Sequence, residues 1–298
     1  MTRALRMRAW LGRFGLPVWF AAWSIASVGL LVLYEFPLGL DARIYHAAAA
    51  AWLAGGNPWS AQASVYYFAG LPPTVLAFVP FTILPEDVFV VLWLGVTVAS
   101  AAWIIKKLRL SWWWLLFPPL AEGIFSGNPQ IVLLALLVSA WGAFLAPALK
   151  VYALVPLAGE WRWRSVGAAA LVLGATVVIA PGLWQTYLGE FGRISDVLAQ
   201  QAVGGFSACY RPLLLVPAVL AILALAVVAL RPATQFHYST FAMPLVGSSP
   251  AVLLLTAALA VPVRGLPAVA IIVYAAWRVL GWWRTRSGAA AQTPVETQ

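Results

Sequence analysis

The sequence has very little charge for its length. Only 9% of its 298 residues are charged, whereas 63% are apolar. A water-soluble domain normally has about a quarter of its residues charged and about half apolar. The composition therefore excludes an ordinary soluble fold. It indicates one polytopic membrane domain, because several apolar runs reach the roughly 20 residues that a bilayer-crossing helix needs.

Cysteine and histidine are also scarce. The one cysteine, Cys209, excludes an internal disulfide and a cysteine-based metal cluster. Two histidines without a cysteine cluster do not make a zinc-binding pattern. The sequence also lacks a glycine-rich phosphate loop of the P-loop or dinucleotide-binding kind. We therefore predict no metal and no cofactor.

Negative charge is scarcer than positive charge. The chain has 18 Lys and Arg against 9 Asp and Glu, a net charge of +9. Most of the basic residues border apolar runs, which is typical of cytoplasmic loops and of contact with anionic lipid headgroups. The positive charge therefore indicates membrane lipids as partners and does not predict nucleic-acid binding.

The apolar runs predict an all-α transmembrane bundle of 8 spans, or 9 if residues 236–263 form two short helices. Four arginines precede the first run, which predicts an uncleaved first span and a cytoplasmic N-terminus. The predicted spans are residues 15–34, 88–105, 111–125, 131–157 (bent near Pro147 and Pro156), 165–184, 213–230, 236–263 and 266–283. Residues 71–84 are proline-rich and too short to span, so we expect a partly inserted segment there.

These spans predict a single domain over residues 1–286. Two outer loops are expected, at residues 35–70 and 185–211. Residues 287–298 are small and polar, which predicts a disordered tail. In the second outer loop, Glu190 and Asp196 lie at helical spacing from Arg193, which predicts an ion pair.

The first outer loop contains a short amphipathic helix pattern that begins near Asp41. Helical spacing places four residues on one face: Asp41, Tyr45, Ala48 and Trp52. Arg43 and His46 lie beside the acid, and this mixture suits a carboxylate base next to cationic groups that hold a phosphate. The alternative is that Asp41 is only an N-terminal helix cap.

Glu122 is the other acid of functional interest. It lies in an apolar run near the outer end of a predicted span. An ionisable residue within a span is costly and is a candidate for function. The alternative is that its side chain reaches the polar turn that follows. Glu86 and Asp87, in contrast, open a predicted helix, where carboxylates favour the helix dipole.

Several short motifs follow one another in a characteristic order. They are Asp41-x-x-x-Tyr45-His46, Leu53-x-Gly55-x-Asn57-Pro58-Trp59, Tyr66-Tyr67-Phe68-x-x-Leu71-Pro72-Pro73, Phe81-x-x-Leu84-Pro85, Gly127-Asn128-x-Gln130, Lys150-Val151-Tyr152 ahead of Arg162-Trp163-Arg164, and Pro232-x-x-x-x-His237-Tyr238. This order resembles the integral-membrane glycosyltransferases of the GT-C type. Among these it is most similar to the polyprenyl-phosphate-mannose-dependent α-mannosyltransferases of glycosyltransferase family 87, over about residues 15–245.

The resemblance implies an inverting hexosyltransferase that uses a polyprenyl-phosphate sugar, with mannose as the expected sugar. The acceptor would be a lipid or glycan of the cell envelope, at the outer face of the plasma membrane. Asp41 would be the general base. The implied contacts to the lipid phosphate are Arg43, Lys150, His237 and Tyr238, and those to sugar or acceptor are Tyr45, His46, Glu122, Asn128 and Gln130.

The chain also departs from the family pattern. It is shorter than is typical, and one span between Arg211 and His237 would place His237 on the inner side, whereas the family pattern needs it outside. A shortened or inactive relative is therefore one alternative. Two others are a transporter or lipid flippase, whose path proline-broken helices can line, and a non-catalytic membrane subunit. A transporter would use Glu122 and Lys150 at mid-membrane, but the sequence has no internal repeat.

Overall fold

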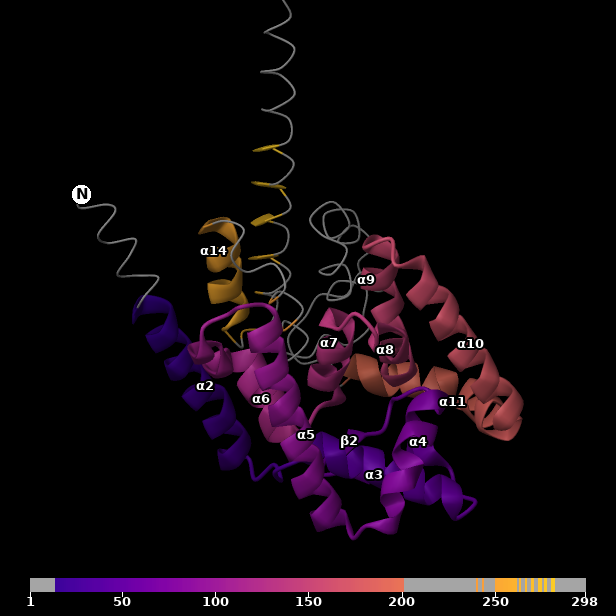
Figure 1. Cartoon of the computed structure of the whole chain (residues 1–298). Helices are drawn as coiled ribbons and strands as arrows, with labels where there is room; N and C mark the ends of the chain where they lie inside the picture. The colour runs from indigo at the N-terminus through magenta and orange to yellow at the C-terminus, as the bar shows by residue number, and fades with distance from the viewer. Residues whose placement is uncertain are drawn as a thin grey trace, which may run out of the picture.

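The computed structural model describes residues 14–200 and 250–261, together with scattered positions between 240 and 281. This part of the chain is mostly helical (Figure 1). Its elements are α2 (Leu16–Leu33), α3 (Leu40–Leu53), η2 (Pro58–Ser60), β1 (Gln62–Ala63), β2 (Tyr66–Tyr67), α4 (Pro72–Phe78), η3 (Val79–Ile83), α5 (Glu86–Lys107), η4 (Trp112–Leu116), α6 (Pro118–Ser126), α7 (Pro129–Val138), η5 (Ala143–Leu145), α8 (Ala146–Leu149), η6 (Val151–Ala153), α9 (Leu154–Gly159), α10 (Trp163–Ile179), α11 (Pro181–Gln200) and α14 (Pro250–Leu259).

Two of the described helices, α2 and α5, are long and apolar enough to cross a membrane. A third span results if α10 and the first part of α11 are counted together, although these meet at an angle of 99°. The chain is therefore a helical protein with two or three candidate membrane helices in its described part. The predicted first span and the span at residues 88–105 coincide with α2 and α5.

Helix α5 has the charge distribution that stabilises a long helix. Glu86 and Asp87 occupy its first turn, and Lys106 and Lys107 occupy its last turn. Acids near the N-terminus and bases near the C-terminus both oppose the helix macrodipole. The basic end also matches the predicted cytoplasmic end of this span.

Helix α2 packs against η4 and α6 through an aromatic contact. Phe20 is fully buried and its ring centroid lies 5.2 Å from that of Trp114 and 5.0 Å from that of Phe117. Ser24, one of the few polar residues of α2, donates from Oγ to the carbonyl oxygen of Leu116 at 2.7 Å. The hydroxyl is therefore paired within the protein, as a polar group on an apolar helix must be.

Helix α3 runs across the direction of α2 and α5 at one end of the molecule (Figure 1). Its N-cap is Gly39, in the left-handed conformation with φ +72°, and a Cβ there would lie 2.4 Å from Cγ1 of Val90. Asp41 lies in the first turn of α3, two residues after this N-cap, and its Oδ2 accepts from Nδ2 of Asn128. The alternative that Asp41 is only a helix cap is therefore wrong, because Gly39 takes that position.

Aromatic rings hold α3 against its neighbours. The ring of Tyr45 lies 5.3 Å from that of Phe68 and 5.0 Å from that of Phe78, and Phe78 lies 4.7 Å from Trp93 of α5. Trp93 Nε1 then donates to the carbonyl oxygen of Gly127 at 2.8 Å in the interior. This chain of contacts fixes the turn between α6 and α7 relative to α3.

The predicted span at residues 111–125 is two helices in the structure. It consists of η4 and α6, which meet at Phe117 in an extended conformation. Pro118 and Pro119 follow directly, and proline has no N–H to continue a preceding helix but fits the first turn of a new one. The break was therefore present in the sequence as this proline pair.

The predicted bend in residues 131–157 lies earlier than expected. We expected it near Pro147 and Pro156, but α7 ends at Val138 and the chain turns directly afterwards. In this turn the backbone N–H of Gly142 donates to Oγ of Ser139 at 2.8 Å. Arg162 also donates to the carbonyl oxygens of Leu137 and Ser139, at 2.7 and 2.9 Å. These bonds stabilise the end of α7.

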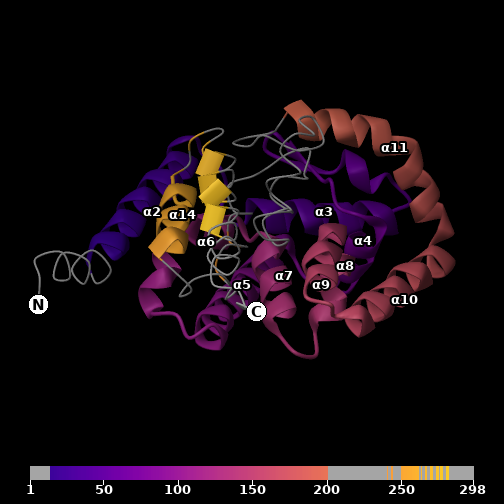
Figure 2. The same ribbon diagram turned by 90° about the horizontal axis from the view of Figure 1, so that it is seen from above.

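Helix α11 occupies the first part of the predicted second outer loop. Together with α10 it forms an arc around one side of the molecule (Figure 2). Glu190 and Arg193 form the predicted ion pair. Arg193 Nη2 donates to the carbonyl oxygen of Trp59, and Asn57 Nδ2 donates to Oε1 of Glu190, both at 2.9 Å. These bonds tie α11 to the first outer loop.

The C-terminal third is only partly described. Helix α14 begins at Pro250, directly after the Gly247-Ser248-Ser249 interruption that the sequence places within residues 236–263. The predicted span at residues 213–230, the residues His237 and Tyr238, and the predicted tail at residues 287–298 lie outside the described residues.

Candidate functional site

The predicted acid Asp41 lies in a group of polar side chains that we call the Asp41 cluster: Asp41, Asn128, Gln130, Lys150 and Tyr152. Asn128 Nδ2 donates to Oδ2 of Asp41 at 2.8 Å. The two residues are 87 positions apart in the chain. Four of the five members were predicted as site residues, and the fifth, Tyr152, belongs to the same motif as Lys150. The structure therefore brings separate motifs of the sequence together.

Asn128 is the central member of the cluster. It is 1% exposed and serves as the N-cap of α7, with Oδ1 accepting from the backbone N–H of Gln130 at 2.9 Å. The same Oδ1 lies 3.5 Å from Nζ of Lys150. Because Oδ1 faces these two donors, Nδ2 faces the carboxylate of Asp41. One amide thus links the acid, the amine and the start of a helix.

Tyr152 approaches the cluster from η6 and donates its hydroxyl proton to Oε1 of Gln130. Lys150, directly before η6, has an extended backbone, and its Nζ lies 3.5 Å from Oδ1 of Asn128. Thr74 of α4 holds the preceding segment, since its Oγ1 lies 2.8 Å from the carbonyl oxygen of Leu149. The position of both side chains therefore depends on packing between α4 and α8.

The surroundings of Asp41 favour its protonated form. Burial raises the pKa of the Asp41 carboxyl above its usual value, although Lys150 and the hydrogen bonds from Asn128 and Ser126 oppose the shift. A carboxylate with a raised pKa is a better proton acceptor than a free one. Asp41 thus has the character of a base that binds a proton readily when a hydroxyl group is placed beside it.

Glu122 and Tyr66 lie near the same acid. Burial raises the pKa of the Tyr66 phenol, and the charges of Glu122 and Asp41 raise it further. Both carboxylates act on the same phenol, so the three groups lie in one region of the protein. Tyr66 comes from β2, Glu122 from α6 and Asp41 from α3. Glu122, predicted as a sugar or acceptor contact, is therefore close to the cluster.

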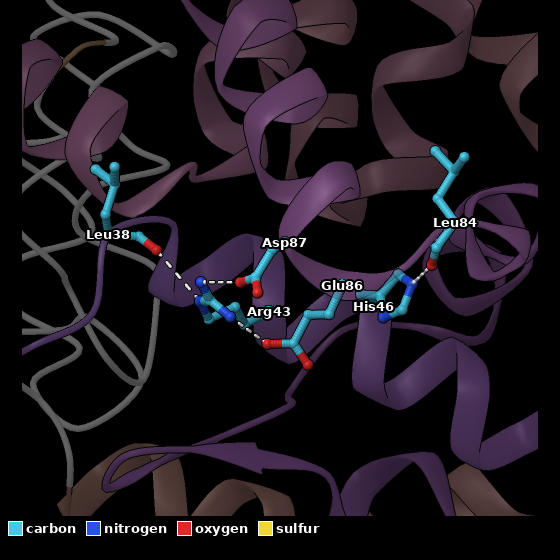
Figure 3. A network of polar contacts seen from close by, with 6 residues as sticks. All are labelled: Leu38, Arg43, His46, Leu84, Glu86 and Asp87. Atoms are coloured by element: carbon cyan, nitrogen blue, oxygen red, sulfur yellow. Dashed lines mark hydrogen bonds and ion pairs between the residues drawn. The ribbon is translucent and has the colours of Figure 1, made fainter.

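Three other predicted site residues have structural contacts. Tyr45 is buried among the aromatic rings that hold α3. The ring of His46 stacks on Phe89 at 5.0 Å, and its Nε2 lies 3.2 Å from the carbonyl oxygen of Leu84. Arg43 forms ion pairs with Glu86 and Asp87 and donates from Nε to the carbonyl oxygen of Leu38 (Figure 3). Arg43 thus connects α3 to the first turn of α5.

Arg43→Met is expected to lower the stability of the folded protein only slightly, as is usual for a substitution in a surface ion pair. The guanidinium contacts two exposed carboxylates and a carbonyl oxygen, so its loss affects a surface ion pair worth about 1 kcal/mol or less. The measurement is the free energy of unfolding of the full chain, with wild type as control. A loss of about 3 kcal/mol or more, the range for breaking a buried ion pair, would contradict this description of Arg43 as a partner in a surface ion pair.

Tyr152, Ser126 and Tyr66 were not among the predicted site residues. Each nevertheless lies within or next to a quoted motif: Tyr152 two residues after Lys150, Ser126 two residues before Asn128, and Tyr66 in the motif of the first outer loop. Proximity in sequence to a candidate was therefore the signal that could have identified them. His237 and Tyr238 lie outside the described residues, so their relation to the cluster stays a prediction.

No group of three or more His, Cys, Asp or Glu side chains in the described residues is arranged to hold a metal ion. The chemistry that the cluster can perform is proton acceptance by Asp41, charge compensation by Lys150 and hydrogen bonding by two amides. No protein-family model matches the chain, and neither a curated protein nor a solved structure is significantly similar to it.

Proposed function

We propose that the chain is an integral-membrane glycosyltransferase that moves a sugar from a polyprenyl-phosphate donor to a lipid or glycan acceptor. Mannose is the sugar that the resemblance to family 87 implies, and Asp41 is the general base. The observation that carries the proposal is the Asp41 cluster. It places a carboxylate of raised pKa, an ammonium group and two amides together, and the carboxylate belongs to the helix that follows α2.

The position of the cluster suits a lipid-linked substrate. Asp41 follows a candidate membrane helix, and the cluster also contacts the turn that α5 holds through Trp93. A polyprenyl tail belongs in the hydrocarbon core, whereas its phosphate and sugar belong at headgroup level. A site at one end of the candidate spans can therefore reach the reacting groups while the tail stays in the bilayer.

The proposed reaction is a single displacement. The acceptor oxygen forms a bond to the anomeric carbon, and the bond from that carbon to the phosphate oxygen breaks. The proton of the acceptor hydroxyl passes to the Asp41 carboxylate, and polyprenyl phosphate leaves with the electron pair. One positioned base is sufficient for such a step, which inverts the configuration of the anomeric carbon.

Lys150 and Asn128 support this step electrostatically. Negative charge grows on the phosphate as it leaves, and a cation placed beforehand in a site of low dielectric lowers the energy of that state. Lys150 is a cation that acts on the Asp41 carboxylate and contacts Asn128. We include His237 and Tyr238 as further phosphate contacts on the strength of the resemblance alone.

The proposal includes a location. The chain lies in the plasma membrane as a bundle of 8 or 9 spans, with its N-terminus in the cytoplasm and the Asp41 cluster at the outer face. The supporting features are the arginines before α2 and the basic end of α5, because Lys and Arg are concentrated in cytoplasmic loops.

The test is transfer from radiolabelled polyprenyl-phosphate-mannose by the full chain in native membranes, with membranes lacking the protein as control. Label is expected to enter a lipid or glycan fraction only when the protein is present. A labelled nucleotide sugar, offered under the same conditions, is expected to give no protein-dependent transfer. The proposal fails if the folded protein transfers label from no polyprenyl-phosphate hexose.

A further inference from the structure

Gln130 has an amide group that is only half satisfied. It is 0% exposed, and Tyr152 donates to its Oε1. Its Nε2 is buried and makes no hydrogen bond within the described part of the structure. A buried donor without a partner is costly and uncommon in proteins, so each instance needs an explanation.

The unpartnered atom belongs to the Asp41 cluster. The backbone N–H of Gln130 donates to Oδ1 of Asn128, and Nδ2 of that same Asn128 donates to Asp41. Because Oε1 is directed to Tyr152, Nε2 is directed away from that ring. The unsatisfied donor is therefore held in a fixed orientation, one side chain away from the proposed base.

We propose that Gln130 is a specificity-determining residue whose amide hydrogen-bonds a hydroxyl group of the sugar on the polyprenyl-phosphate donor. This inference rests on the proposed function for the identity of the donor. A buried polar group that only a ligand can satisfy gives strong discrimination, because a ligand without the matching group leaves it unpaired.

A sugar hydroxyl fits the amide better than a phosphate oxygen does. If the amide were turned over, Nε2 would donate to the Tyr152 hydroxyl and Oε1 would be the unpartnered atom. A hydroxyl group satisfies either arrangement because it both donates and accepts, whereas a phosphate oxygen only accepts. Lys150 also provides a charged partner for the phosphate close by.

The experiment measures equilibrium binding of radiolabelled polyprenyl-phosphate-mannose to the purified full chain in nanodiscs. Gln130→Met removes the amide and keeps the length of the side chain. It is expected to weaken binding about tenfold, as for loss of one buried hydrogen bond. Gln185→Met makes the same chemical change at an exposed residue of α11, so it is the matched control and is expected to retain the affinity of wild type.

Two further comparisons show whether the oxygen that binds the Gln130 amide belongs to the sugar or to the phosphate. Sugar-free polyprenyl phosphate is expected to bind wild type and Gln130→Met equally, and equal weakening with both ligands would overturn the sugar assignment in favour of a phosphate contact. Donors that lack single hydroxyl groups are then compared on wild type. One of these donors is expected to bind wild type about as weakly as the full donor binds Gln130→Met. If every one of them binds wild type as tightly as the full donor, the assignment of Gln130 to a sugar hydroxyl is overturned.

The outcome for Gln130 is separate from the outcome for transfer, because binding needs no turnover. Equal losses in Gln130→Met and Gln185→Met would show that the loss does not depend on the buried amide and would overturn the inference. The unfolding temperature provides a second readout. Gln130→Met removes the unpaired Nε2 but also the acceptor of the Tyr152 hydroxyl, so the unfolding temperature of the ligand-free protein is expected to stay close to that of wild type. Weaker donor binding with an unchanged unfolding temperature supports the inference, whereas a large fall in the unfolding temperature would assign Gln130 a structural role and overturn it.

Discussion

Asp41→Asn is expected to lower the rate of sugar transfer by about 10²- to 10⁴-fold, the usual contribution of a general base. The substitution keeps the shape of the side chain, and the new Oδ1 can still accept from Asn128. It removes the ability to take the acceptor proton, together with the negative charge on which Lys150 acts. The measurement is transfer from labelled polyprenyl-phosphate-mannose at equal protein concentration.

Stability separates this catalytic role from a structural one. The pKa of Asp41 is raised in the folded state, so the folded protein binds this proton more tightly than the unfolded chain does. Stability from this group is therefore present at low pH and is lost as the pH rises from the unfolded towards the folded pKa. Above that window Asp41→Asn is expected to unfold at a temperature no lower than wild type.

Asp87→Asn is the matched control for Asp41→Asn. It makes the same chemical change at a side chain that is 86% exposed and pairs with Arg43. Its rate of transfer is expected to equal that of wild type. Full transfer by Asp41→Asn would remove the proposed base, and a loss accompanied by a lower unfolding temperature would indicate a structural residue.

Asn128→Asp is expected to slow transfer at neutral pH by about tenfold or more, because it replaces a donor to a charged group by a second carboxylate. The new side chain can still cap α7, since a carboxylate oxygen accepts from the N–H of Gln130 as the amide oxygen does. Its other oxygen, however, faces Asp41 at the position where Nδ2 donates at 2.8 Å.

The pH dependence should change in a defined direction. A neighbouring negative charge disfavours the charged form of Asp41 and raises its pKa further. Since the base must be deprotonated, transfer falls as the pH falls through this pKa. The acidic limb of the pH–rate profile is therefore expected to move to higher pH in Asn128→Asp, and transfer should recover as the pH rises.

Asn57→Asp is a close control for Asn128→Asp. Asn57 also caps a helix, with Oδ1 accepting from the N–H of Trp59 at 3.0 Å, and its Nδ2 also donates to a carboxylate, that of Glu190. The same local conflict therefore arises outside the Asp41 cluster. The acidic limb is expected to stay in place in this variant, and an identical shift in both would show a general effect of added charge.

The main helices could be predicted because their signals are local. The apolar runs at residues 15–34 and 88–105 are uninterrupted, and the basic residues after the second mark its end, so α2 and α5 were confirmed. The helix over Leu40–Leu53 was also predicted, since its alanines favour a helix. In contrast, residues 111–125 were predicted as one span because they are apolar throughout. The structure has two helices there, since Pro118 and Pro119 end the first and begin the second.

Other features of the structure could not be predicted, because they depend on contacts between residues far apart in the sequence. The end of α7 at Val138 is stabilised by Arg162, which lies 25 and 23 residues after its two carbonyl partners. The helical part of residues 185–211 is held by Asn57 and Trp59 of the first outer loop. Arg43 was predicted beside a phosphate, whereas its donors face Glu86 and Asp87, which the sequence assigned only to the start of a helix.

The sequence by itself determined that this is a helical chain with helices long and apolar enough to cross a membrane. The order of its motifs, through the resemblance, singled out Asp41, Asn128, Gln130 and Lys150 as candidate site residues. Only the tertiary structure decided that these side chains meet. The physical reason is that a buried polar group must find its hydrogen-bond partner within the fold. The partner of Asp41 is therefore set by the packing of α3 against the α6–α7 turn, 87 residues along the chain.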